Sequence, residues 1–246
     1  MMLRYLLAFV LIVAMAGAAV PTRAGEEAAG PVRVLIVTGN DYPGHKWRET
    51  TPMVRQALEA APGRFAVRVV EDPEIMATRL ADRYDVVVLH FCNWETPSPS
   101  RAALDGLAGF VRQGGGLVAL HFACGAFLDW PEYEKLIGRV WDQSKTHDPY
   151  GTFTVNVKKE HPITRGLADF ETSDELYFCL KGAPAIEVLL TARSTMTKQD
   201  EPMGFTLPYG RGRVFHTPLG HDVKSFAAPG VARLLQNACA WAAGRS

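Results

Sequence analysis

The residues of this chain that could do chemistry are histidines that follow predicted strands. His121 ends the apolar run at residues 117–120, and His45 lies in the loop GNDYPGHKW that follows an earlier apolar run. His221 lies in the turn FHTPLGHD, after a third run. In an open α/β sheet the loops at the carboxyl ends of the strands meet at one edge. The sequence therefore predicts that these three imidazoles converge.

Converging imidazoles support two kinds of chemistry. A histidine can accept or donate a proton near neutral pH, and neutral imidazole also binds divalent metal ions. In the second case the three histidines are the candidate metal ligands. The sequence has no local metal motif such as HExxH, so a metal site would be assembled from distant loops. The sequence leaves both an acid/base site and a metal site open. Three carboxylates could belong to either site: Asp41, Glu175 and Asp222.

Aromatic side chains in or beside the same loops suit a sugar ring. They are Tyr42, Trp47, Trp94 and Trp130. An aromatic face can cover the apolar face of a sugar while neighbouring polar groups bind its hydroxyls. At least half of these rings are expected simply to close the top of the core. The expected contacts to a small-molecule carbohydrate come from four residues: Asp41, His45, Trp94 and Asp222.

Three other histidines are expected to have structural rather than catalytic roles. His90 ends a run of valines, so we expect it to be packed in the core. His147 and His161 are expected on surface loops, and His161 precedes a proline and should fix a turn.

The four cysteines show no CxxC spacing, which argues against a structural zinc site. Cys124 is a candidate nucleophile on a strand-to-helix elbow, but an elbow would place His121 or Phe122 at the reactive position. Cys92 and Cys124 each follow a strand by a few residues. The sequence leaves open whether these two cysteines form a disulfide, and we expect them to be buried free thiols.

The elements that must position these side chains alternate between strand and helix. The first half predicts strands at residues 33–38, 65–70, 85–90 and 117–120, with helices at 48–61 and 101–113. This spacing predicts right-handed βαβ units and a parallel sheet. The second half predicts strands at 150–157, 187–192, 204–207 and 212–217, a short helix at 130–138 and one closing helix at 226–243.

The first 24 residues differ from the rest. Arg4 is followed by an apolar run and then by small residues, and cleavage after Ala18 or Ala24 fits a secretory signal. An uncleaved membrane anchor is the alternative. We expect residues 25–246 to form a single domain exported to the periplasm, with no membrane span after cleavage. Lys+Arg and Asp+Glu are balanced at 26 each, which makes nucleic acid an unexpected partner.

Several segments together resemble the trehalose-utilisation (ThuA-like) family. They are VLIVTGNDYPGHKW, GGGLVALHFA, DWPEYEKLIG, HPITRGL, SDELYF and GRGRVFHTPLGHD, which cover nearly all of the chain after the signal. The resemblance implies an α/β, flavodoxin-like, doubly wound, mostly parallel sheet with helices on both faces, as in class I glutamine amidotransferases. It also implies a role in sugar metabolism, and it includes His45, His121, Glu175 and His221 in recurring segments. The amidotransferase elbow cysteine is missing, so the chemistry must differ.

The leading hypothesis is an enzyme acting on a sugar or 3-keto-sugar derivative by isomerisation or by glycosidic elimination or hydrolysis. His121 or His221 would remove a proton, and a second histidine or a divalent metal ion would stabilise the enediolate. Glu175 would orient a histidine or act as the acid. The alternatives are a non-catalytic carbohydrate-binding or accessory domain that works with a sugar oxidoreductase, and a thiol hydrolase or amidotransferase. The sequence leaves open whether the protein forms a homo-oligomer.

Overall fold

A nine-stranded sheet organises the chain, and its first half is parallel. The computed structural model describes residues 30–40, 42–94, 96–143 and 146–245, so the predicted signal segment and its cleavage sites lie outside the described residues. From Pro31 onward the chain forms one compact unit. Five neighbouring strands run parallel, in the spatial order β2 (Phe65–Val70), β1 (Val32–Val37), β3 (Val86–Leu89), β4 (Gly116–Leu120) and β9 (Gly212–Thr217).

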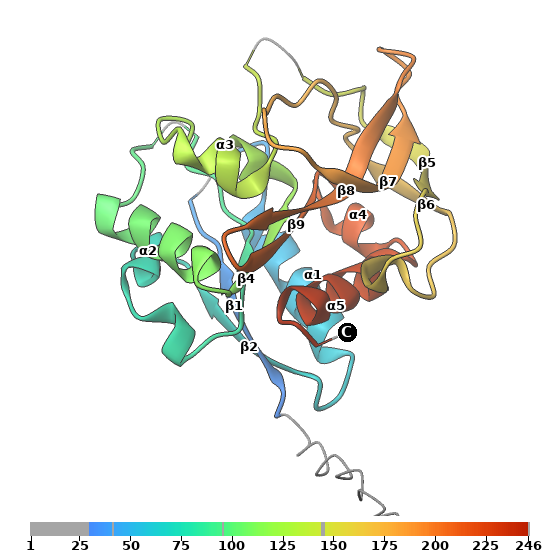
Figure 1. The fold of residues 1–246 in the computed structure, drawn as a ribbon. Coiled ribbons are helices and arrows are strands. Elements are labelled where there is room, and N and C mark those ends of the chain that lie inside the picture. The colour runs from blue at the N-terminus through green and yellow to red at the C-terminus, as the bar shows by residue number, and fades with distance from the viewer. Residues whose placement is uncertain (1–29, 41, 95, 144–145, 246) are drawn as a thin grey trace, which may run out of the picture. The chain divides into compact units, whose positions relative to one another are not determined.

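Helices cover both faces of this parallel half (Figure 1). Helices α1 (Trp47–Glu59) and α5 (Val231–Ala242) cover one face, and α2 (Arg101–Arg112) and α3 (Glu132–Ile137) cover the other. Neighbouring residues of β1 enter different cores: Val34 packs with the first pair of helices and Leu35 with the second. The central strands are apolar on both faces because both are covered. The predicted flavodoxin-like α/β fold is confirmed.

The second half of the sheet is antiparallel and extends from β9. Its order is β8 (Asp200–Tyr209), β7 (Glu187–Arg193), β5 (Gly151–Val157) and β6 (Phe170–Asp174). Strand β6 is missing from the sequence-based prediction because its sequence, FETSD, carries a single large apolar residue and lies at the sheet edge. This strand matters for the site, because the chain leaves it at Asp174 and Glu175.

The closing segment is two helices, and the prediction of one continuous helix at 226–243 is wrong. Helix α4 (Val223–Ala227) begins at its N-cap Asp222, and α5 begins only after Pro229 and Gly230. A proline removes a helical hydrogen bond and so favours such a break. Four short 3₁₀ segments complete the fold: Pro73–Ala77, Leu80–Asp82, His121–Gly125 and Pro162–Thr164. Among the described residues, no helix is long and apolar enough to cross a membrane.

A buried histidine in β9 should make the protein sensitive to acid. Burial lowers the pKa of His216 to about 4, below the usual unfolded value of about 6.5. The neutral ring therefore adds stability that is fully present above pH 6.5 and is lost as the pH falls towards 4. Lowering the pH from about 7 to 5 should cost about 2 kcal/mol through this residue alone.

The measurement is the free energy of unfolding in urea at both pH values, with chelator present. We expect His216→Gln to lose about 2 kcal/mol less than the wild type over this range. Equal losses in the two proteins would show that His216 is not a buried neutral group.

Candidate functional site

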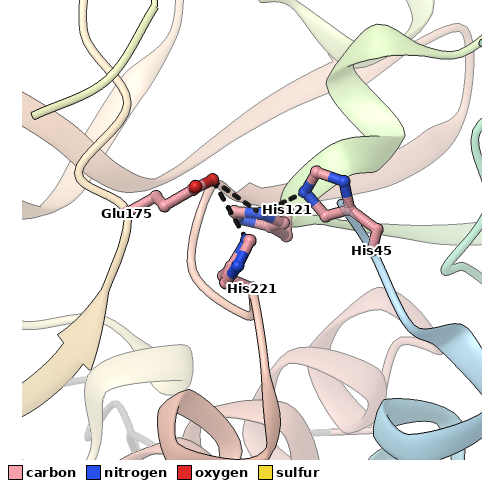
Figure 2. Close-up of side chains that lie close together, drawn as sticks. All are labelled: His45, His121, Glu175 and His221. Atoms are coloured by element: carbon pink, nitrogen blue, oxygen red, sulfur yellow. Dashed lines mark hydrogen bonds and ion pairs between the residues drawn. The ribbon is translucent and has the colours of Figure 1, made fainter. Parts of the chain in front are cut away.

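Four side chains from four separate segments meet at the carboxyl edge of the parallel strands. His45 comes from the loop after β1, His121 from the end of β4, and His221 from the loop after β9. Glu175 follows β6, the strand that the sequence did not predict. Figure 2 shows the four side chains pointing towards one another. One ligand atom from each lies within 4.8 Å of all the others. The predicted convergence of the three histidines is what the structure shows.

The shortest contacts join the histidine nitrogens to one another and to the carboxylate. His45 Nε2 lies 2.9 Å from His121 Nε2. Glu175 Oε2 lies 3.1 Å from His221 Nδ1 and 3.8 Å from His121 Nε2. The imidazole of His121 is almost fully buried, and the Glu175 and His221 side chains are 14% and 20% exposed. The cluster therefore keeps one side open to solvent.

His121 occupies the elbow between β4 and the following 3₁₀ segment. Its φ of 45° lies in the left-handed region, which non-glycine residues adopt rarely and often at functional sites. His121 Nδ1 lies 2.6 Å from the carbonyl oxygen of Pro218 and donates to it in the neutral ring. This bond fixes the tautomer, so the Nε2 lone pair faces the cluster. A histidine stands at the position where an elbow would hold its nucleophile.

The loop that carries Pro218 and His221 is held by a buried carboxylate, Asp174. Its oxygens accept hydrogen bonds from the backbone N–H groups of Gly220, at 2.8 Å, and His221, at 3.2 Å. Gly220 has a φ of 124°, and a Cβ there would meet the ring of Phe226, so glycine is required at this turn. Burial raises the pKa of Asp174 to about 7 against the opposing effect of these N–H groups. Sequence reasoning did not single out Asp174, because nothing local marks its strand.

An aromatic cluster fixes the ring of His45. The ring stacks on Phe122, with centroids 3.8 Å apart, and Tyr42 lies stacked at 5.9 Å. Trp94 stacks on Tyr42 and lies 5.1 Å from Phe122. Trp94 is half-buried against the core rather than lining the cavity beside the cluster. Its expected contact with a carbohydrate stays a prediction.

The protonation of the cluster is set by burial and by Glu175. Burial lowers the pKa of His45 to about 3, and the neighbouring His221 acts in the same direction. Burial, with the charge of His45, lowers the pKa of His121 well below its usual value. Burial also disfavours the charged form of His221, but contact with Glu175 and the charges of nearby carboxylates outweigh it, and its pKa is raised. Burial thus favours the neutral form of His45 and His121, whereas the nearby carboxylates favour the charged form of His221.

This donor set fits a divalent metal ion. For two nitrogens bonded to one zinc ion at about 2.0–2.1 Å, bond angles of about 90–110° place them about 2.9–3.4 Å apart. The 2.9 Å between His45 Nε2 and His121 Nε2 falls in that range. His221 Nδ1 is buried and lacks an aligned hydrogen bond among the described residues, although Glu175 lies within ion-pair distance. An ion would take up the lone pairs of all three nitrogens.

A small cavity adjoins the cluster. It has a volume of about 30 Å³ and is lined by His45, His121, His221 and His90 among others. This is room for one or two water molecules, whereas a pocket for a whole small-molecule ligand measures about 300–1,000 Å³. Only a reacting group could enter, and the rest of a substrate would lie outside. His90 was expected to pack in the core; it is half-buried and lines this cavity, with Nε2 2.8 Å from Thr50 Oγ1.

The remaining candidates have different places. Asp41 lies outside the described residues. Asp222 caps α4 by accepting from the backbone N–H groups of Lys224 and Ser225, and its other oxygen accepts from Tyr150, so it supports the turn that carries His221. Its expected role in binding substrate stays a prediction.

Two further residues lie beside the cluster. His147 lies on a loop and its side chain is 30% exposed, as expected of a surface residue, but its contact with the cluster was not predicted: Nε2 lies 3.4 Å from Glu175 Oε1 and Nδ1 2.7 Å from the carbonyl oxygen of Asp148. Tyr177 was not considered, yet its hydroxyl lies 3.0 Å from His121 Nε2. Both come from the irregular segments around β5 and β6, where no strand pattern marks the site. His161 does fix a turn, because its ring accepts from the backbone N–H of Ile163.

The thiols take no part in the cluster. All four cysteines are free, and Cys92, Cys124 and Cys239 are buried. Burial raises the pKa of Cys92 to about 12 and that of Cys124 well above its usual value, so neither is a ready nucleophile. Cys179 is exposed.

Iodoacetamide under native conditions should therefore modify Cys179 alone. The readout is peptide mass spectrometry, with unfolded protein as the control in which all four thiols react. Rapid alkylation of Cys124 in the native protein would contradict the prediction that this thiol is buried and protonated. It would then support a thiol-based reaction.

Comparison with known proteins decides the family. The family model for ThuA, described as trehalose utilisation, matches residues 33–242. The chain belongs to the ThuA family. The matched range includes every residue of the cluster, so the site is part of the family domain. No curated protein matches the sequence.

Solved structures agree with the ThuA fold. A ThuA-like protein from Parabacteroides merdae is 28% identical with a TM-score of 0.76, covering 87% of this chain and 91% of that one. A ThuA-like protein from Bacteroides uniformis is 22% identical with a TM-score of 0.69, covering 90% and 95%. A GMP synthase component from Thermoplasma acidophilum is 15% identical with a TM-score of 0.55, covering 87% and 95%. The last two show the fold alone.

Proposed function

We propose that this ThuA-family protein is an exported, metal-dependent enzyme that acts on a sugar derivative carrying a keto group. The observation that supports the proposal is the set of three imidazole nitrogens and one carboxylate oxygen within 4.8 Å of one another. Carbohydrate utilisation is the role given for the family. The reaction is removal of a proton from the carbon next to the carbonyl, leading to isomerisation or to elimination of a glycosidic bond.

Three histidines would hold the ion: His45 and His121 through Nε2, and His221 through Nδ1. Three imidazoles with an open position are a common ligand set of catalytic zinc sites. When bound, the ion would polarise the substrate carbonyl and stabilise negative charge on its oxygen. An imidazole nitrogen must be unprotonated to bind a metal ion, and the pKa of His221 is raised, so binding of the ion would weaken as the pH falls.

Glu175 is then the proton acceptor. Its Oε2 lies 3.1 Å from His221 Nδ1 and 3.8 Å from His121 Nε2, so the carboxylate would lie beside a substrate carbonyl held at these histidines. Its other oxygen lies 3.4 Å from His147 Nε2, and His147 is partly exposed. A proton taken from the substrate carbon can thus be held on Glu175 and leave through His147. This division of roles uses four histidines and one carboxylate without a thiol.

The substrate class follows from the small cavity and the chemistry. Space for one or two water molecules admits a carbonyl carbon and its neighbour, while the remaining sugar lies over the opening. A keto group in a sugar ring acidifies the neighbouring C–H bond, so one base and one electrophile suffice. An oxidoreductase that converts a sugar alcohol to a ketone must supply such a substrate. We propose that both proteins work in the periplasm, consistent with the signal-like first 24 residues.

The test is a screen of enzymatically oxidised disaccharides in D₂O with zinc-loaded protein, followed by NMR. Exchange of the proton next to the keto group, with product formation, supports the proposal. Glu175→Gln should keep the ion and lose the exchange. Loss of the ion in that variant would make Glu175 a ligand instead. Saturable binding without exchange in the wild type would favour a non-catalytic carbohydrate-binding domain.

A further inference from the structure

The hydroxyl of Tyr177 is a buried polar group next to the proposed ion that has no role so far. Its oxygen lies 3.0 Å from His121 Nε2 and 3.4 Å from His45 Nε2. Those two nitrogens are 2.9 Å apart, so the three polar atoms form a closed triangle. The tyrosine is 2% exposed. A polar atom this deeply buried normally needs a hydrogen-bond partner.

The position of the ring is fixed by its neighbours. Tyr177 packs against Trp141, with centroids 4.8 Å apart, and against the imidazole of His121 at 4.5 Å. Its backbone forms a bridge with that of His147. The hydroxyl is therefore held towards the histidine nitrogens, and it cannot turn to solvent without disturbing the packing.

Coordination of an ion would remove the acceptor that this hydroxyl now has, the lone pair of His121 Nε2. The unprotonated nitrogen of a neutral imidazole has one lone pair, and binding of an ion uses it. A phenol hydroxyl carries one proton that it can donate. The hydroxyl then becomes a buried donor beside two ligand nitrogens, neither of which can accept from it. An oxygen of a molecule bound at the open position would satisfy it.

We infer that Tyr177 is a catalytic residue whose hydroxyl donates a hydrogen bond to the substrate oxygen that gains negative charge. The inference rests on the proposed function. The C–H bond next to the carbonyl breaks and its proton goes to Glu175. The electron pair forms the new C=C bond, while the C=O π pair moves to the oxygen. Tyr177 keeps its proton and stabilises that charge, as donors of an oxyanion hole do. The ligand class is an α-hydroxy carbonyl compound and its enediolate-like anion.

The experiment uses acetohydroxamate, a small anionic chelator that resembles an enediolate. Zinc affinity and acetohydroxamate affinity of the zinc-loaded protein are measured by calorimetry for the wild type, Tyr177→Phe and Tyr209→Phe. The last variant is the control: Tyr209 ends β8, beyond the amino end of β9, and donates to Glu132. Phenylalanine retains the aromatic packing in both variants.

We expect Tyr177→Phe to bind zinc within about threefold of the wild type and acetohydroxamate about 10- to 100-fold more weakly. Tyr209→Phe should match the wild type in both. Unchanged acetohydroxamate affinity in Tyr177→Phe would overturn the inference while leaving the zinc site intact. A loss of zinc affinity in that variant would also overturn it, because Tyr177 would then be a ligand. Failure of the wild type to bind zinc would overturn the proposed function itself.

Discussion

Replacing His121 by alanine should abolish tight binding of zinc. His121 is the central donor of the cluster: its Nε2 faces His45 at 2.9 Å and Glu175 at 3.8 Å, and its Nδ1 is fixed by Pro218. If a binding free energy of about 10–16 kcal/mol is shared among three ligands, losing one costs roughly 10²- to 10⁴-fold in affinity. Calorimetry with a competing chelator measures this change, and turnover of a keto sugar should fall with it.

The control for this prediction is His161→Ala. His161 caps the 3₁₀ segment Pro162–Thr164 through its ring nitrogen and takes no part in the cluster. Zinc affinity should be unchanged in this variant. If His121→Ala bound zinc as tightly as the wild type, the ion would be held elsewhere and the assignment of ligands would be wrong.

Replacing Asp174 by alanine should have the largest effect on stability. The backbone N–H groups of Glu175, Gly220 and His221 all donate to its carboxylate within the protein interior. Each buried donor left without a partner costs about 1–3 kcal/mol. Allowing for partial relaxation, we expect the free energy of unfolding to fall by about 3–5 kcal/mol. Because the loop with Pro218 and His221 loses its support, zinc affinity should fall as well.

Urea unfolding and zinc calorimetry check this prediction together. Asp174→Asn should also destabilise the protein, since an amide NH₂ would face one of the backbone donors. Asp72→Ala is the matched control: Asp72 is an N-cap that accepts a backbone N–H at an exposed site, and its loss should cost about 1 kcal/mol. A cost for Asp174→Ala no larger than that for Asp72→Ala would show that the carboxylate does not hold the loop.

The parallel half of the fold could be predicted because its strands are covered on both sides. Strands such as Val86–Leu89 are continuous apolar runs followed by turn residues, and their carboxyl ends mark the edge where ligands gather. His45, His121 and His221 follow such strands, so their convergence was predictable. Glu175 was named from the sequence only as one of three candidate carboxylates, and its strand was not predicted.

The antiparallel half was harder to predict for a physical reason. Strand β6 is a short edge strand with two exposed or half-exposed positions among five, and its pairing with β5 depends on partners distant in sequence. Asp174, Tyr177 and His147 reach the site through this pairing. The sequence therefore identified the imidazoles but missed the residues that hold and complete the cluster.

We propose that three histidines at one edge of the sheet, His45, His121 and His221, bind a single divalent ion. The most direct measurement is a crystal structure of zinc-loaded protein with anomalous difference maps on both sides of the zinc absorption edge. We expect one strong peak bonded to His45 Nε2, His121 Nε2 and His221 Nδ1, with the carboxylate of Glu175 beside it. A peak at other residues, or none at this cluster in protein saturated with zinc, would contradict it.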